Sequence, residues 1–206
     1  MNKLNSNLFK YQTRVGRKER ESLLSQNSFV IWFTGLSASG KSSVGNNLEY
    51  NLHKMGYLTF MLDGDNVRYG LNMDLGFSDK DRKENIRRIA HVSKLLMDAG
   101  IIVIVTFISP FKEDRNFVRQ LVETQNFVEI FVDCPLDVCM SRDKKGLYQK
   151  AIKKEISDFT GISSPYEKPD NPEIKIDTGK MGVEEATSYI LEYLFNKNLI
   201  KKDIRK

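Results

Sequence analysis

Runs of apolar residues alternate with amphipathic stretches along most of the chain. The runs predict five strands, at Phe29 to Thr34, Leu58 to Leu62, Ile101 to Phe107, Val128 to Val132 and Ile174 to Ile176. The first four are nearly unbroken and rich in Val, Ile and Phe, which predicts central strands buried on both faces. An order of strand, helix, strand, helix is typical of an α/β fold in which helices cover a parallel sheet.

Two stretches between these runs have clear helical spacing. A helix is predicted after Lys41, with an apolar stripe made by Val44, Leu48, Leu52 and Met55. Gly56 stops this stripe. A second helix is predicted after Ser78, which forms an approximate capping box with Asp81. Its stripe ends at Gly100 and consists of Ile86, Ile89, Val92, Leu96 and Ala99.

The second half of the chain is less regular. Helices are predicted from Lys112 to Thr124 and from Val183 to Phe195, and Ser164 to Pro172 is predicted to be a loop. The stretch from Leu136 to Phe159 is polar and basic and interrupts the alternation between the fourth and fifth strands. We predict that residues 136–160 form a basic lid outside the core.

Composition and charge favour one domain. The 206 residues are 40% hydrophobic, which is enough for one sizeable core. The net charge of +5 is uneven: residues 1–27 and 197–206 carry +4 each, whereas the body carries −3. We therefore predict a domain at 28–196 between a basic extension at 1–27 and a basic tail at 197–206. This distribution argues against a broad nucleic-acid-binding face.

The same survey argues against export. No apolar run approaches the roughly 18 residues of a membrane span, and the first residues lack an apolar signal core. Cys134 and Cys139 are too few for a disulfide framework, and we expect both to be small buried residues. We predict a cytoplasmic protein without a membrane partner.

The most informative stretch follows the first predicted strand. Its residues fit the phosphate-loop pattern G-x-x-x-x-G-K-[ST], and with the next serine the predicted nucleotide contacts are Gly35, Leu36, Ser37, Ala38, Ser39, Gly40, Lys41, Ser42 and Ser43. Glycines allow a tight turn whose backbone N–H groups point at one anion. Lys41 is predicted to neutralise the β- and γ-phosphates, and Ser42 to bind Mg²⁺. The sequence predicts a P-loop NTPase fold that binds ATP or GTP.

Further acids narrow the class of P-loop protein. The string Asn196 to Leu199 lacks the acid of a guanine-reading motif, and the third strand ends without a Walker B carboxylate. Asp63 and Asp65 instead follow the second strand, whose carboxyl end should face the same crevice as the phosphate loop. Asp63 is predicted to join Ser42 at Mg²⁺ and to accept the proton of an attacking hydroxyl. A second substrate with a hydroxyl group is therefore expected.

A series of motifs makes the sequence resemble the adenylylsulfate kinase family from about Asn7 to Thr178. The motifs are Phe33-Thr34-Gly35-Leu36-Ser37, Leu62-Asp63-Gly64-Asp65-Asn66-Val67-Arg68, Asp74-Leu75-Gly76-Phe77-Ser78, Asn85-Ile86-Arg87-Arg88, Phe107-Ile108-Ser109-Pro110, Lys145-Gly146-Leu147-Tyr148 and Phe159-Thr160-Gly161-Ile162. The resemblance implies transfer of the ATP γ-phosphoryl group to the 3′-hydroxyl of adenosine 5′-phosphosulfate (APS), a step of sulfate assimilation. It also implies a homodimer.

The resemblance supplies candidates for the acceptor site: Asp65, Arg68, Phe77, Arg82, Asn85, Ile108, Ser109, Lys145 and Phe159. Arginine forks suit phosphate and sulfate oxygens, and Phe77 and Phe159 resemble the pair that brackets the acceptor's adenine. Ser109, with Lys41 and Asp63, is a catalytic candidate because the family's serine is described as a phosphoserine. A serine without a neighbouring base is a weak nucleophile, so we predict direct in-line transfer with Ser109 as a substrate contact.

The sequence departs from the family at one lid position. Ile152 stands where the family often has arginine, so no lid arginine contact is expected there. Two alternatives remain open from the residues. Another small-molecule P-loop kinase, for nucleoside monophosphates or a sugar acid, would have the same phosphate loop and a similar lid. A nucleotide-gated switch would bind ATP or GTP and use its basic ends on a partner.

Overall fold

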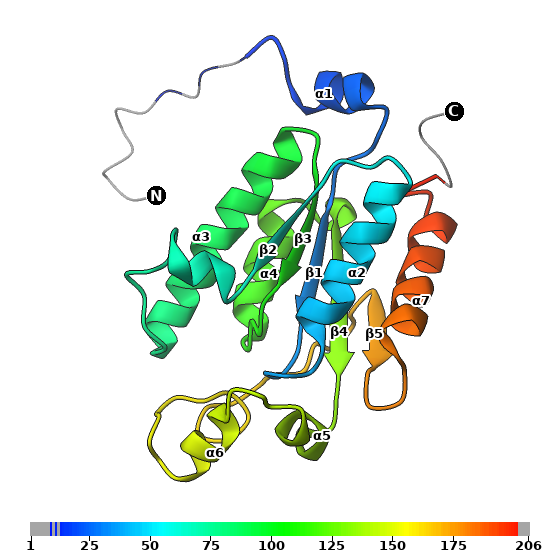
Figure 1. The fold of residues 1–206 in the computed structure, drawn as a ribbon. Coiled ribbons are helices and arrows are strands. Elements are labelled where there is room, and N and C mark those ends of the chain that lie inside the picture. Colours follow the sequence, from blue (N-terminus) through cyan, green and yellow to red (C-terminus); the bar gives the residue numbers. More distant parts are fainter. Residues whose placement is uncertain (1–8, 10, 12, 202–206) are drawn as a thin grey trace.

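The apolar runs form one parallel sheet in the computed structural model, which describes residues 9, 11 and 13–201. The strands are β1 (Val30–Thr34), β2 (Thr59–Asp63), β3 (Ile102–Thr106), β4 (Phe127–Asp133) and β5 (Ile174–Asp177). Their order across the sheet is β2-β3-β1-β4-β5, and every neighbouring pair is parallel (Figure 1). The predicted α/β fold with five strands is confirmed, with each boundary within one residue.

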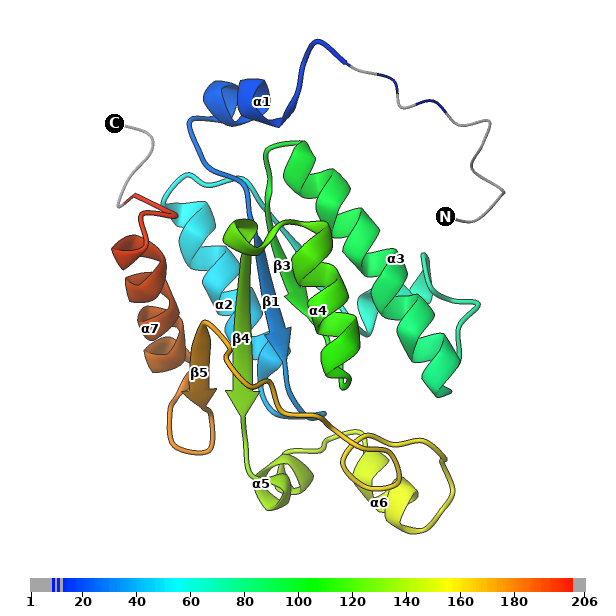
Figure 2. The ribbon, with the colours of Figure 1, turned by 180° about the vertical axis from the view of Figure 1, so that it is seen from behind.

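Alternating side chains of the strands fill two cores. On β1, Ile31 and Phe33 pack beneath α2 (Lys41–Lys54) and α7 (Val183–Asn196), whereas Val30 and Trp32 pack beneath α3 (Asp79–Asp98) and α4 (Lys112–Leu121). Figures 1 and 2 show these helix pairs on opposite faces of the sheet. Burial on both faces explains why the first four positions of β1 are apolar.

The prediction that the first four strands are all buried is wrong for β2. This strand lies at the edge of the sheet and pairs only with β3. Phe60 in its middle is 49% exposed, and the preceding Leu58 is 46% exposed. An apolar run does not reveal which strand the chain topology leaves at the edge.

The predicted helices form, with small changes at their ends. The Oγ of Ser78 accepts a hydrogen bond from the backbone N–H of Asp81 at 3.2 Å, which confirms the predicted cap of α3. The helix predicted to reach Thr124 ends earlier, at Leu121, because Glu123 adopts a left-handed φ of 68°. Helix α7 continues one residue beyond the predicted end, to Asn196.

Three short helices were not predicted. Helices α5 (Leu136–Ser141) and α6 (Leu147–Ile152) belong to the basic 136–160 stretch and lie beyond the carboxyl ends of the strands (Figure 1). Helix α1 (Arg17–Leu24) lies at the opposite end, where Arg20 donates a 3.0 Å hydrogen bond to the carbonyl of Asp98. Within the predicted basic ends, residues 1–8, 10, 12 and 202–206 lie outside the described residues.

The expectation that the two cysteines are buried is met. Cys134 and Cys139 are buried free thiols. Among residues 9, 11 and 13–201, no helix has the length and apolar character needed to cross a membrane.

Candidate active site

The phosphate loop connects β1 to α2 and packs tightly against β4. A Cβ atom at Gly35 would lie 2.6 Å from the carbonyl oxygen of Val132, so a larger residue would displace the loop. Gly40 precedes α2 with a φ of 96°, in the left-handed region that favours glycine. These glycines let the chain turn into α2, so that the helix N-terminus faces the concave side of the loop.

The Lys41 side chain lies inside this loop. Its Nζ donates hydrogen bonds to the carbonyl oxygens of Gly35, at 2.9 Å, and Leu36, at 2.6 Å. Only 7% of the residue is exposed, and burial lowers the Lys41 pKa to about 8. A poorly hydrated ammonium group gains more from an anion than from neutral carbonyls, so this position favours a bound phosphate.

Asp63 lies at the carboxyl end of β2 and reaches the phosphate loop. Its Oδ2 accepts hydrogen bonds from the hydroxyls of Ser42 at 2.7 Å and Thr106 at 2.8 Å. Burial alone would raise the Asp63 pKa, but these bonds and those from backbone N–H groups of Asp65 and Asn66 outweigh burial and lower it. The carboxylate is therefore ionised at neutral pH.

The pair of Ser42 and Asp63 has the donor chemistry that Mg²⁺ uses beside a nucleotide. Magnesium retains several waters and binds through one or two protein oxygens together with substrate phosphates. A hydroxyl and an ionised carboxylate that already meet at 2.7 Å fit this requirement. Within the described part of the chain, no cluster of three or more His, Cys, Asp or Glu offers an all-protein metal site.

A second cationic region lies beside Asp63. The guanidinium groups of Arg68 and Arg82 lie 4.3 Å and 5.8 Å from the ring centroid of Phe77. Burial lowers the pKa of both arginines, and the charge of Arg68 lowers that of Arg82 further. Phe77 is 59% exposed, which is unusual for a large aromatic side chain. Two neighbouring guanidinium groups and the exposed ring of Phe77 favour a ligand that carries anionic groups and a flat base.

One pocket joins the two regions. Its lining includes the predicted residues Ser37, Ala38, Lys41, Ser42, Asp63, Asp65, Arg68, Phe77, Arg82, Asn85, Ile108 and Ser109. Asn85 is buried on α3, one turn from Arg82, and its Oδ1 accepts a 2.6 Å hydrogen bond from Asn72. The structure thus brings together, in a single crevice, residues that the sequence spreads over about seventy positions.

Ser109 occupies a constrained position in this pocket. Its φ of 39° is left-handed, and only 2% of the residue is exposed. Its Oγ accepts a hydrogen bond from the indole Nε1 of Trp32 at 3.0 Å and donates to the carbonyl of Phe107 at 3.5 Å. Neither partner is a base that could activate the hydroxyl as a nucleophile.

The two candidates from the 136–160 stretch lie away from Phe77. Lys145 forms an ion pair with Asp65 and lines a second pocket, together with Gly40, Ser43 and Arg142. Phe159 packs edge-on against Tyr148, with ring centroids 4.9 Å apart, and does not line the pocket that contains Phe77. Arg82 nevertheless donates a hydrogen bond to the carbonyl of Asp158, next to Phe159.

Several residues that shape the crevice were not predicted. The hydroxyl of Tyr148 donates to the carbonyl of Ser37 at 2.9 Å, and the hydroxyl of Thr178 donates to the carbonyl of Ser39 at 2.7 Å. Thr106 and Trp32 hold Asp63 and Ser109, as described above. Of these four residues, only Tyr148 lies in a motif noted from the sequence. Thr178, Thr106 and Trp32 are identified only by hydrogen bonds to residues far away along the chain.

The parallel sheet, the phosphate loop and the acid on a nearby strand define a P-loop kinase. The profile of the family described as Adenylylsulphate kinase matches residues 27–177. The chain is 56% identical over 193 residues to the adenylyl-sulfate kinase of Clostridium acetobutylicum, covering 94% of this chain and 96% of that protein. The chain therefore belongs to the adenylylsulfate kinase family.

Solved structures agree with this assignment. The Mycobacterium tuberculosis APS kinase CysC in complex with AMPPNP and APS superposes with a TM-score of 0.79 and 45% identity, covering 82% of this chain and 99% of that chain. The hexameric APS kinase from Thiobacillus denitrificans superposes with a TM-score of 0.66 and 32% identity. That match covers 88% of this chain and 31% of the longer Thiobacillus chain.

Proposed function

We propose that this protein transfers the γ-phosphoryl group of ATP to the 3′-hydroxyl of APS, giving 3′-phosphoadenosine 5′-phosphosulfate and ADP. The carrying observation is the shared pocket, in which Asp63 lies between the phosphate loop and the arginine-flanked Phe77. This pocket and the second pocket share Lys41, Ser42 and Asp65, so the two together offer adjoining places for two anionic nucleotides, with the Asp63 carboxylate on the acceptor side. The family membership supports the same reaction.

On the donor side, Lys41 neutralises charge on the β- and γ-phosphates while the loop backbone holds them. Ser42 and Asp63 are the residues that would hold Mg²⁺, which supplies further charge neutralisation on the transferring group. Because all these groups are fixed by the fold, alignment and electrostatic stabilisation account for most of the rate enhancement.

On the acceptor side, Asp63 orients the 3′-hydroxyl and receives its proton as the new bond forms. A low pKa makes Asp63 a weak base, which suits a loose transition state in which the proton leaves late. Arg68 and Arg82 bind the phosphosulfate, and Phe77 stacks on the adenine. Asp65, Asn85 and Ile108 complete the contacts. Ser109 contacts the acceptor, and the phosphoryl group passes directly between the substrates.

The remaining assignments concern the lid and the assembly. Residues 136–160 act as the lid of one domain at 28–196. When the lid closes, Lys145 leaves its ion pair with Asp65 and binds a phosphate group instead. Phe159 moves towards the adenine of the acceptor in the same step. The basic ends at 1–27 and 197–206 are extensions of this domain. We propose a cytoplasmic homodimer, in line with the family; sedimentation equilibrium at the monomer mass would contradict the dimer.

A coupled ADP-release assay tests the reaction. We expect APS-dependent ADP formation, and only background ADP with nucleoside monophosphates or gluconate as acceptor. Turnover of one of those acceptors, and not of APS, would instead identify another small-molecule kinase. Nucleotide binding without any acceptor-dependent ADP would identify a switch. The assay thus separates the three functions that the sequence left open.

Replacing Phe77 by alanine tests the stacking role. Base stacking on an aromatic side chain contributes about 1–3 kcal/mol, so Phe77→Ala should raise the KM for APS about 5- to 150-fold. The KM for ATP should change little, because Phe77 does not line the second pocket beside the phosphate loop. Steady-state kinetics with each substrate varied in turn give both constants.

Tyr69→Ala provides the matched control. Tyr69 is 88% exposed, lies just after Arg68 and does not line the pocket. Its removal should leave both KM values unchanged. Equal effects of Phe77→Ala and Tyr69→Ala on the KM for APS would exclude stacking on Phe77.

A further inference from the structure

Arg115 on α4 reaches beneath the 108–110 loop, the segment Ile108–Pro110 that follows β3 and lines the acceptor side of the pocket. The guanidinium donates a 2.6 Å hydrogen bond to the carbonyl oxygen of Ser109 and a 2.7 Å bond to that of Glu167. Arg115 is only 2% exposed and does not line the pocket, so it acts on substrate only through what it holds.

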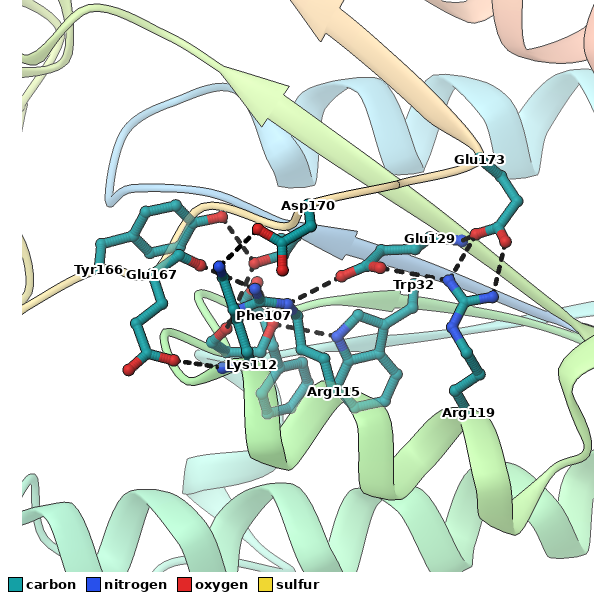
Figure 3. Close-up of polar contacts among 12 residues, drawn as sticks. Trp32, Phe107, Lys112, Arg115, Arg119, Glu129, Tyr166, Glu167, Asp170 and Glu173 are labelled. Carbon is teal, nitrogen blue, oxygen red and sulfur yellow. Dashed lines mark hydrogen bonds and ion pairs between the residues drawn. The ribbon is translucent and has the colours of Figure 1, made fainter.

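A buried carboxylate fixes the guanidinium in place. Glu129 in the middle of β4 accepts a 2.8 Å hydrogen bond from Nε of Arg115 and a 3.2 Å bond from Arg119 (Figure 3). Arg119 makes two further bonds to Glu173, at 2.6 Å and 2.7 Å. Two arginines one helical turn apart thus share one counter-ion, but only Arg115 contacts the 108–110 loop.

The second carbonyl that Arg115 holds belongs to the 166–170 segment, which leads from the lid back towards β5. Glu167 donates its backbone N–H to the carbonyl of Pro110 at 2.9 Å, and its carboxylate accepts from the backbone N–H of Lys112 at 2.7 Å. The Lys112 side chain bonds Asp170 at 2.6 Å (Figure 3). The segment and the 108–110 loop therefore form one unit, with Arg115 bonded to both parts.

Ser109 explains why the loop needs this support. A left-handed φ at a residue other than glycine is strained, and such conformations persist where surrounding bonds hold them. The carbonyl of Ser109 also accepts a 3.3 Å bond from Thr34, and the Oγ of Ser109 is held by Trp32. The bond from the charged Arg115 is the shortest of these three.

We propose that Arg115 is a positioning residue for the acceptor: anchored by Glu129, it holds the strained 108–110 loop against the 166–170 segment in the shape that receives APS. The proposal rests on the proposed function for its kinetic consequence. Its structural consequence concerns the loop itself and is independent of any substrate.

The test compares Arg115→Lys with the control Arg119→Lys. Both variants keep a positive charge near Glu129, but the three N–H donors of a lysine share one nitrogen and cannot span the three acceptors that Nε, Nη1 and Nη2 of Arg115 reach. A small displacement of the pocket wall that contacts a substrate has a large effect on the binding and reaction of that substrate. Arg115→Lys should therefore raise the KM for APS about 10-fold or more and leave the KM for ATP within about 2-fold. Arg119→Lys should change neither constant.

Trp32 provides a readout without substrates. It is the only tryptophan of the chain and bonds Ser109 directly, so its fluorescence reports on the 108–110 loop. We expect emission at longer wavelength in Arg115→Lys and unchanged emission in Arg119→Lys, at matched fractions of folded protein. If Arg115→Lys does not fold, Glu129→Gln, which removes the counter-ion, carries the test and should raise the KM for APS in the same direction.

The outcomes are distinguishable from failure of the proposed function. Wild-type protein without APS-dependent ADP release would contradict the function, whereas the emission comparison would still test the loop. Equal KM values for APS and equal Trp32 emission in Arg115→Lys and Arg119→Lys would overturn the positioning role. Wild-type KM for APS and wild-type emission in Glu129→Gln would also overturn it.

Discussion

Replacing Lys41 by alanine lowers kcat by on the order of 10³-fold or more, because the transferring phosphates lose a preorganised charge in a water-poor site. The same change leaves the stability of the substrate-free protein equal or higher. The Lys41 pKa is about 8 in the folded chain, below its ordinary value of 10.5. Burying the charged form therefore costs stability below pH 8, and this cost disappears as the pH rises through 10.5.

Single-turnover kinetics and thermal unfolding at pH 7 measure the two effects of Lys41→Ala. Lys54→Ala is the control, since Lys54 ends the same helix, α2, and is exposed at its far end. It should retain wild-type turnover. Near-normal activity of Lys41→Ala would show that the phosphate loop does not act in catalysis as described. A large drop in the melting temperature of Lys41→Ala would contradict the conclusion that burial of the Lys41 charge costs stability.

Replacing Asp63 by asparagine lowers kcat by about 10²- to 10⁴-fold, because both the proton acceptor and the charged magnesium ligand are lost. The Asp63 pKa lies below its ordinary value of 3.8, so the wild-type carboxylate stays ionised as the pH falls towards 4. Protonation of Asp63 should therefore cause no fall in kcat at any pH above 5. The stability that its hydrogen bonds contribute is likewise lost only below pH 4.

A pH series of kcat for the wild type and Asp63→Asn checks both statements. Asp98→Asn serves as control, since Asp98 is the last residue of α3, at the opposite end of the helix from Arg82 and Asn85, and pairs with Lys94. Asp63→Asn that kept more than about a tenth of wild-type kcat would exclude Asp63 as proton acceptor. If the kcat of the wild type fell below about pH 6 and that of Asp63→Asn did not, the lowered pKa of Asp63 would be contradicted.

The parts of the site that the sequence predicted are those with a local cause. The phosphate loop is defined by glycines whose backbone cannot tolerate a side chain, as at Gly35. Asp63 ends β2, and parallel strands present their carboxyl ends at one edge of the sheet, so its place beside the phosphate loop could be inferred. Residues such as Trp32, Arg115 and Thr178 could not be predicted, because their roles depend on partners between 6 and 139 positions away.

The edge position of β2 and the short helices of the 136–160 stretch were not predicted either, for physical reasons. Leu58 and Phe60 are as apolar as residues of a central strand, and only the path of the chain exposes them. Helices α5 and α6 have six residues each, less than two turns, so hydrophobic spacing cannot reveal them. The basic charge of residues 136–160 was visible, but their secondary structure was not.

The strand order fixes how far apart the backbones of the phosphate loop and Asp63 lie. Because β3 lies between β1 and β2, the phosphate loop and Asp63 extend from strands about 10 Å apart, twice the usual spacing between neighbours. Backbone hydrogen bonds between the strands fix that width, so movements of the 136–160 stretch or of the outer helices do not alter it. Substitutions in the pocket walls can therefore change the acceptor that is bound, while the separation between the backbones of the phosphate loop and Asp63 stays constant.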